Sequence, residues 1–294
     1  MLTGEYTPRY SSKENPAMRK HLTTVILVIL LLAGVSLLLY PTVSDYWNSF
    51  HQTQAIASYT EQVADLDQVD YDKLIKDARE YNRELAEKPA RYVLTEDERA
   101  RYNSLLDVAG NGIIGYIEIP KIRCSLPIYH GLEDTVLQIA VGHIEGTSLP
   151  VGGKSTHCVL SGHRGLPRAK LFTDIDQLEK GDTFMIRVLD ETLTYEVDQI
   201  RIVLPDEMED LKIIEGKDLC TLVTCTPYGV NSHRLLVRGH RVANAAGDIR
   251  VTADALQIDP LIVAPAAAVP LLTVLLIYLL LPRRGKGERR NRRR

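Results

Sequence analysis

The sequence is poor in cysteine, with only four among 294 residues, at Cys124, Cys158, Cys220 and Cys225. So few and scattered cysteines cannot form the disulfide framework of a small stapled domain. No CxxC pair occurs, and no histidine and cysteine stand at metal-ligand spacing, which argues against a zinc site. We therefore expect no metal and no other cofactor.

Two stretches lack charge altogether, the 19 residues Leu22–Tyr40 and the 21 residues Leu261–Leu281. Each is long enough to cross a hydrocarbon core of roughly 30 Å as a helix. The first run could be a cleaved signal peptide. However, it is longer than the usual apolar core of such a peptide, and it leads into Tyr40-Pro41 instead of a small-x-small cleavage site. We expect a retained anchor at 22–40 and a second transmembrane helix at 261–281.

The formal net charge of −3 hides a strong asymmetry along the chain. Residues 1–21 carry +2, residues 283–294 carry +7, and the segment 41–260 between the spans carries −12. Because positive flanks mark the cytoplasmic side, both the N-terminus (1–21) and the basic tail (282–294) are expected in the cytoplasm. A basic tail after an apolar run favours contact with anionic membrane lipid over nucleic acid.

The segment between the spans changes character near residue 110. Asp45–Glu87 shows helical spacing that stops before Pro89, and Thr95 with Glu98 forms a capping box for a second helix reaching Leu106. We expect residues 41–109 to be helical and 251–260 to be a linker. Residues 110–250 hold eight short β-branched runs and two short helical stretches, around 135–141 and 169–177, which favours a closed barrel or sandwich. The expected strands are 116–119, 125–129, 157–160, 184–188, 193–197, 199–203, 219–225 and 234–237.

The stretch Thr221–Gly239, TLVTCTPYGVNSHRLLVRG, is expected to be a hairpin. Strand formers on both sides enclose a loop of about seven residues that is rich in Pro, Gly, Asn and Ser. Antiparallel pairing across that loop places Cys225 opposite or diagonal to His233 or Arg234. A thiol and a guanidinium therefore share one site.

A nucleophilic cysteine needs a cationic or basic partner, because the thiolate is the reactive form. His163 lies in the turn LSGHRG (160–165) between glycines, which leaves an imidazole exposed after a strand. His233 is the local rival in the hairpin, and His130 and His143 lie in similar glycine-containing turns. The residues alone leave this choice open.

Several motifs together resemble those of the sortases, the membrane-anchored cysteine transpeptidases of Gram-positive cell surfaces. TLVTC is similar to the TLxTC signature of that family, and the second span with its basic tail resembles the class C, pilus-assembling branch. The remaining matching motifs are GYIEIPKI (115–122), LPIYHG (126–131), VGHIEGTSLPVGG (141–153), LSGHRGLPRAKLFTDID (160–176) and CTPYGVNSHRLLVRG (225–239). The resemblance implies an eight-stranded sortase-like β-barrel, mainly β in class, with N-terminal helices and two flanking transmembrane helices.

Residue by residue, the resemblance implies that Cys225 is the nucleophile, His163 the catalytic histidine and Arg234 the arginine of the triad. It also implies cleavage of an LPXTG-like sorting signal through a thioacyl enzyme, which a lysine amine of the next pilin resolves into an isopeptide bond. Two alternatives are attachment of surface proteins to a peptidoglycan precursor, and a non-catalytic membrane-anchored binding module.

One motif departs from the class C pattern. Class C sortases commonly carry an Asp-Pro-aromatic lid, where this sequence has Lys88-Pro-Ala-Arg-Tyr92. A lysine would repel the cationic Arg234 where an aspartate would pair with it. We therefore expect the site to be open more of the time than in lidded relatives.

Overall fold

A computed structural model describes residues 16–167 and 169–244, which form two compact units. The described part of the first unit is residues 16–43, and that of the second is residues 44–167 and 169–244. The predicted linker at 251–260, the second span at 261–281 and the tail at 282–294 lie outside the described residues.

Helix α1 (Pro16–Ala64) contains the predicted anchor. From Thr24 onward it is long and apolar enough to cross a membrane, and its most apolar 18-residue window has a mean hydropathy of 2.5. It is the one such helix in the part of the chain that the structure describes.

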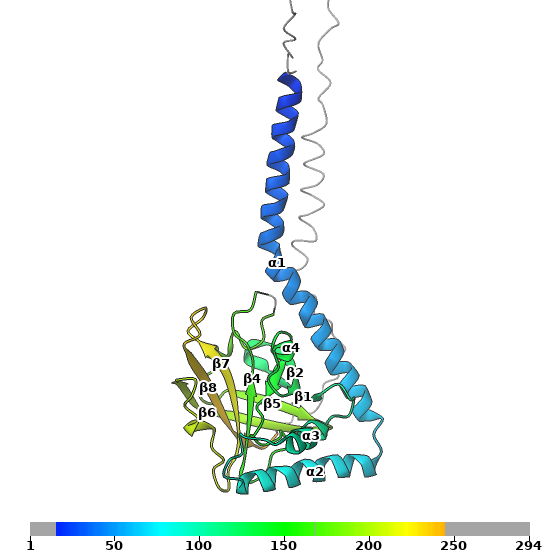
Figure 1. Ribbon diagram of the computed structural model, residues 1–294, viewed down its shortest axis with the longest axis vertical. Helices are drawn as coiled ribbons and strands as arrows, with labels where there is room; N and C mark the ends of the chain where they lie inside the picture. The colour runs from blue at the N-terminus through cyan, green and yellow to red at the C-terminus, as the bar shows by residue number, and fades with distance from the viewer. Residues whose placement is uncertain (1–15, 168, 245–294) are drawn as a thin grey trace, which may run out of the picture. The chain divides into compact units, whose positions relative to one another are not determined.

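Eight strands close into a barrel in the order β1-β2-β3-β4-β7-β8-β6-β5, which confirms the predicted mainly β, eight-stranded fold (Figure 1). The pairs β2/β3 and β4/β7 are parallel, and the others are antiparallel. The strands are β1 (Ile113–Ile119), β2 (Cys124–His130), β3 (Val141–His143), β4 (Thr156–Ser161), β5 (Thr183–Val188), β6 (Glu191–Val203), β7 (Asp218–Thr226) and β8 (His233–Val242).

Two strand predictions were wrong in detail. The runs 193–197 and 199–203 are one strand, β6, which carries a bulge where the register shifts between Val197 and Gln199. The added residue of the bulge interrupts the alternation of side chains, so the sequence pattern resembled two strands. Strand β3 lies at the end of the stretch 135–141, which was expected to be helical. It was not predicted because three residues are too few to show alternation, and helix α4 (Asp134–Leu137) is correspondingly shorter than predicted.

The helices before the barrel form a packing layer on it. The predicted helix 45–87 breaks after Ala64, and Asp67 caps α2 (Gln68–Glu87) by accepting from the Asp70 N–H at 2.8 Å. The capping box of Thr95 and Glu98 at α3 (Glu96–Ser104) is confirmed. Short 3₁₀ turns complete the fold; the predicted helix at 169–177 is reduced to one of them. These turns are η1 (Pro120–Ile122), η2 (Ile175–Gln177) and η3 (Glu209–Leu211).

One continuous core joins these helices to the barrel interior. Tyr59 of α1 and Tyr102 of α3 are fully buried in it. Asn82 of α2 fastens the layer to the barrel, because its side chain accepts from the Leu149 N–H at 2.7 Å and donates to the Leu149 carbonyl at 3.0 Å. In Figure 1, α2 lies at one end of the barrel and the β7–β8 hairpin loop at the other.

Candidate active site

Three neighbouring strands bring the three predicted catalytic residues to one level of the barrel. Cys225 of β7 and Arg234 of β8 are direct cross-strand partners. On the other side of β7, the parallel register pairs Ser161 of β4 with Val223, and the Gly162 N–H continues it by donating to the Val223 carbonyl at 3.1 Å. His163 follows Gly162 in the loop after β4, so continuation of this register brings it to the level of Cys225. The row His163, Cys225, Arg234 crosses the ends of β4 and β7 and the start of β8.

Cys225 is a free, partly exposed thiol one residue before the end of β7. The other cysteines differ from it. Cys158 and Cys220 are buried cross-strand partners inside the barrel, and burial raises the pKa of Cys124 to about 12. Burial also raises the pKa of the Cys220 thiol, and Cys158 is enclosed in the barrel away from solvent, so Cys225 is the thiol suited to nucleophilic chemistry.

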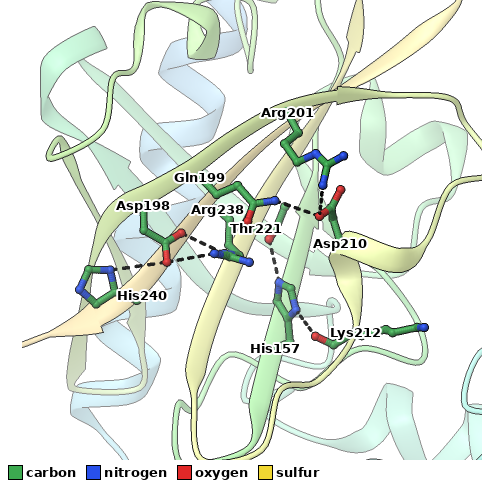
Figure 2. Close-up of polar contacts among 9 residues, drawn as sticks. All are labelled: His157, Asp198, Gln199, Arg201, Asp210, Lys212, Thr221, Arg238 and His240. Atoms are coloured by element: carbon green, nitrogen blue, oxygen red, sulfur yellow. Dashed lines mark hydrogen bonds and ion pairs between the residues drawn. The ribbon is translucent and has the colours of Figure 1, made fainter.

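Arg234 has donors available for an incoming anionic group. Its Nη1 donates to the carbonyls of Asn231 at 3.2 Å and His233 at 3.1 Å, which orients the guanidinium through neutral acceptors. Among residues 16–167 and 169–244, no carboxylate forms an ion pair with it. Arg238 lies four residues further along β8, where its Nε and Nη2 donate to the Asp198 carboxylate at 2.9 and 3.2 Å (Figure 2).

Two glycines allow the loop that carries His163 to pack closely against neighbouring aromatic rings. A Cβ at Gly162 would come within 2.8 Å of the Phe172 ring, and the His163 carbonyl accepts from the Phe172 N–H at 3.1 Å. Gly165 has a φ of +75°, and a Cβ there would meet the Tyr228 ring at 2.8 Å. These glycines let the loop lie against Phe172 and against the β7–β8 loop, next to Cys225.

Arg164 is a site residue that sequence reasoning missed. Its guanidinium forms an ion pair with Asp176 and donates to the Thr226 hydroxyl at 3.4 Å, which ties the His163 loop to the end of β7. Its place next to His163 was visible in the sequence. The partners that give it a role are distant in sequence and could not be predicted.

The rival histidines have other surroundings. His143 is fully buried, with its Nε2–H donating to the Ser148 carbonyl at 2.9 Å and its Nδ1 accepting from the Tyr102 hydroxyl at 2.8 Å. His130 packs edge-on to Tyr102, and burial lowers its pKa to about 4. His233 precedes Arg234 on β8, so strand alternation turns it away from the face that carries Arg234. The geometry thus favours His163 as the partner of Cys225.

An apolar floor adjoins Cys225 on the outer face of the same strands. Val223 and Leu236 share this face with Cys225 and Arg234, because side chains two residues apart on a strand point the same way. They form a small cluster separate from the barrel core, and Leu211 of η3 packs onto it from the loop between β6 and β7. The buried members of the cluster are Val159, Val203, Leu211, Val223 and Leu236.

The loop bearing Leu211, residues 204–217, is held to the barrel on both sides of that residue (Figure 2). Asp210 accepts from the Gln199 amide at 2.9 Å and from Arg201 Nη1 at 3.2 Å. The His157 Nδ1–H donates to the Lys212 carbonyl at 2.8 Å, and its Nε2 accepts from the Thr221 hydroxyl at 2.7 Å. The loop therefore covers the apolar cluster that Val223 and Leu236 belong to.

His157 makes the attachment of the 204–217 loop to the barrel depend on pH. Burial lowers its pKa from 6.5 to about 4, so the neutral ring binds the loop. As the pH falls, His157 becomes protonated near pH 6.5 in the unfolded chain but only near pH 4 in the folded chain. The contribution of neutral His157 to the free energy of unfolding is therefore fully present above pH 6.5 and is lost as the pH falls toward 4. We expect this loss to be on the order of 3 kcal/mol for His157. His157→Gln should reduce the slope of unfolding free energy against pH for the full chain in detergent, whereas exposed His51→Gln should not. An unchanged slope in His157→Gln would refute this role.

The segment 88–93 contacts the 204–217 loop and the loop that carries Gly146. Arg91 donates to the Leu211 carbonyl at 2.9 Å, and a Cβ at Gly146, in the facing loop, would come within 2.4 Å of the Arg91 carbonyl oxygen. Lys88 pairs with Glu98 of α3 at 2.6 Å. Within residues 16–167 and 169–244, no hydrogen bond or ion pair joins this segment to Cys225 or Arg234.

Replacing residues 88–93 with a Gly/Ser linker should therefore change the reactivity of Cys225 little. If a state in which this segment covers Cys225 is hardly populated, removing the segment exposes little additional thiol. We therefore expect less than about a threefold rise in the alkylation rate of Cys225. Site-resolved mass spectrometry of alkylated Cys225 measures this rate. A large increase would mean that the segment does cover the thiol.

No group of three or more His, Cys, Asp or Glu side chains suited to a metal ion occurs within the described ranges. The residues around Cys225 offer a nucleophile, a proton carrier in His163 and a cationic hydrogen-bond donor in Arg234. These are the groups that acyl transfer requires.

Comparison with known proteins agrees with this chemistry. The family model for the Sortase domain matches residues 117–242. Sortase C1 of Streptococcus agalactiae is 54% identical, with a TM-score of 0.64 over 65% of this chain and 100% of that one. Sortase C of Streptococcus pneumoniae, an enzyme with specificity for pilin substrates, is 41% identical, with a TM-score of 0.59 over 66% of this chain and 98% of that one. Clostridium perfringens sortase C, solved with the C-terminal cell wall sorting motif, is 45% identical, with a TM-score of 0.57 over 65% and 100%.

A curated relative is more distant. Sortase D of Bacillus subtilis is 33% identical over 131 residues, which are 44% of this chain and 63% of that protein. The match thus spans less than two thirds of that relative.

Proposed function

The chain belongs to the sortase family of cysteine transpeptidases, and from this premise we propose that it joins pilin subunits at the cell surface. The cross-strand pair of Cys225 and Arg234, with His163 in the loop that follows the adjacent strand β4, supports the proposal most directly. The identity of 41 to 54% with solved class C sortases supports the pilin-joining branch.

In the first step, the Cys225 thiolate attacks the threonine carbonyl of an LPXTG-like sorting signal. The C–S bond forms as the carbonyl becomes an oxyanion, which the Arg234 guanidinium and backbone N–H groups stabilise. His163, as the imidazolium, gives its proton to the glycine nitrogen, so that the C–N bond breaks and a neutral amine leaves. The product is a thioester between the threonine and Cys225.

In the second step, a lysine side-chain amine of the next pilin attacks the thioester. His163, now neutral, accepts the proton of that amine, and the Cys225 thiolate leaves as the isopeptide bond forms. The thiolate and imidazolium pair is restored.

We further propose that the protein is held in the membrane by two helices with both termini cytoplasmic. The helix from Thr24 onward is apolar enough to supply the first span. The uncharged run 261–281, followed by a tail of +7, supports the second span and its orientation.

The acceptor amine separates this function from attachment to the cell wall. The full-length protein, incubated with a sorting-signal peptide, should yield a covalent product with a pilin lysine and little product with a peptidoglycan-precursor amine. Gel electrophoresis with mass spectrometry of the cross-link identifies which amine was used. Preferential use of the precursor amine would overturn the pilin assignment and leave the transpeptidase chemistry intact.

A further inference from the structure

Helix α1 carries an exposed aromatic stripe where it joins the second compact unit. Tyr46, Trp47 and Phe50 are 49%, 63% and 51% exposed, and their spacing places them within an arc of about 100° on the helix. Trp47 is the only tryptophan in the chain, and the other two phenylalanines, Phe172 and Phe184, are fully buried. The three rings thus form one exposed aromatic patch on a single face of the helix.

The opposite face of the same helix segment is committed to the barrel. The Asp45 carboxylate accepts from the Lys170 N–H at 2.8 Å, and the Gln52 amide donates to the Ile139 carbonyl at 2.6 Å. The helix thus cannot rotate to bury its aromatic stripe without losing these bonds. Within the stripe, the His51 ring meets Trp47 edge-on at 5.0 Å between centroids, which orders the aromatic side chains before any partner arrives.

The position of the stripe in the chain indicates what its aromatic side chains contact. Trp47 is seven residues after Tyr40, where the uncharged run ends. A chain extends at most about 3.6 Å per residue, so Trp47 lies within roughly 25 Å of that end whatever the direction of the chain. Tyrosine and tryptophan are enriched at the boundary between headgroups and acyl chains, because each has an apolar ring and a polar atom.

We propose that Tyr46, Trp47 and Phe50 dock on the outer surface of the bilayer and so hold the catalytic end of the barrel at the membrane. Two hydrogen bonds link the docking helix to the site. Asp45 accepts from Lys170, and two residues later the Phe172 N–H donates to the His163 carbonyl. Docking itself requires only the anchor and the stripe. Its consequence, that a substrate is met at the membrane surface, rests on the proposed function.

The single tryptophan reports on docking directly. The full-length protein is placed in lipid nanodiscs that contain lipids brominated either just below the headgroups or at the chain ends, and Trp47 emission is recorded. We expect a roughly twofold loss of emission with the shallow bromines, a smaller loss with the deep bromines, and little quenching by aqueous iodide. This fluorescence readout does not depend on catalysis. Docking can therefore be refuted while the transpeptidase function stands, and the transpeptidase function can be refuted while docking stands.

Three other outcomes would overturn the proposal. Strong iodide quenching without bromolipid quenching would show a stripe open to water. Weak quenching by all agents would show that protein covers it, from a second copy or another segment. Strongest quenching by the deep bromines would show that this part of α1 is inserted as a span.

A pair of variants separates docking from mere proximity to the anchor. Tyr46→Ser with Phe50→Ser leaves the reporter in place, and it should at least halve the shallow bromolipid quenching while iodide quenching rises. Val69→Ser, at a 76% exposed apolar residue of α2, should leave both unchanged. Circular dichroism checks that each variant is folded. Unchanged shallow quenching in the folded double variant would show that the anchor alone holds Trp47 near lipid, and would refute docking by the stripe.

Discussion

Cys225→Ala is expected to abolish both cleavage of the sorting signal and formation of the isopeptide product. The alanine removes the only atom that can form the thioester, so the rate should fall by on the order of a thousandfold or more. The fold should persist, because Cys225 is partly exposed at the end of β7 and a smaller side chain leaves no sealed cavity. Product formation by the full-length variant, followed by mass spectrometry, measures the loss. Retained turnover would rule out Cys225 as the nucleophile.

The remaining cysteines provide the matched controls. Cys124, Cys158 and Cys220 pack in or against the core, so their replacement by alanine should keep activity largely intact. Some loss of stability is expected for Cys158 and Cys220, which are buried side by side on β4 and β7. A loss of activity in a stable Cys124→Ala variant as large as that in Cys225→Ala would contradict the assignment.

Arg234→Lys is expected to lower turnover on the order of a hundredfold. Lysine keeps the positive charge but lacks the planar set of donors that can direct two hydrogen bonds at one oxyanion. The Nη1 bonds to the Asn231 and His233 carbonyls orient this fork, and an ammonium group cannot reproduce that arrangement. Single-turnover kinetics with a sorting-signal peptide separates the thioester-forming step from the rest.

Arg238→Lys is the matched control for this substitution. Arg238 lies on the same face of β8, and its guanidinium is occupied by the Asp198 carboxylate. We expect it to retain most of the activity, with any effect arising through stability. Equal losses in Arg234→Lys and Arg238→Lys would show that the guanidinium of Arg234 has no special role at the reacting carbonyl.

The sequence predicted that Cys225 lies opposite or diagonal to His233 or Arg234, because this depends on local order, and the observed register pairs it with Arg234. Strand formers, turn formers and strand formers again define a hairpin, and the loop length places the two residues opposite each other. The choice of histidine could not be made in this way. His143 and His163 lie in similar turns, and only the long-range packing of the barrel shows that His143 is enclosed by Tyr102 and Ser148.

The position of the 204–217 loop could not be predicted from the sequence either. Residues 204–217 show no periodicity, and their order comes from partners on β4 and β6, such as His157 and Gln199, that no local pattern identifies. The bulge in β6 was missed for a related reason. The insertion interrupts alternation at Asp198, and its benefit, the ion pair with Arg238, is visible only when β6 and β8 lie side by side.

The most direct test of the central claim is a search for the thioacyl enzyme. The full-length protein is incubated with a sorting-signal peptide without an acceptor amine, quenched in acid and digested for mass spectrometry. We predict an adduct with the mass of the peptide up to its threonine, on Cys225 alone, that forms far more slowly in His163→Ala and disappears when a lysine amine is added. Cleavage of the peptide with no adduct on Cys225 at any time, or an adduct on another cysteine, would contradict the account.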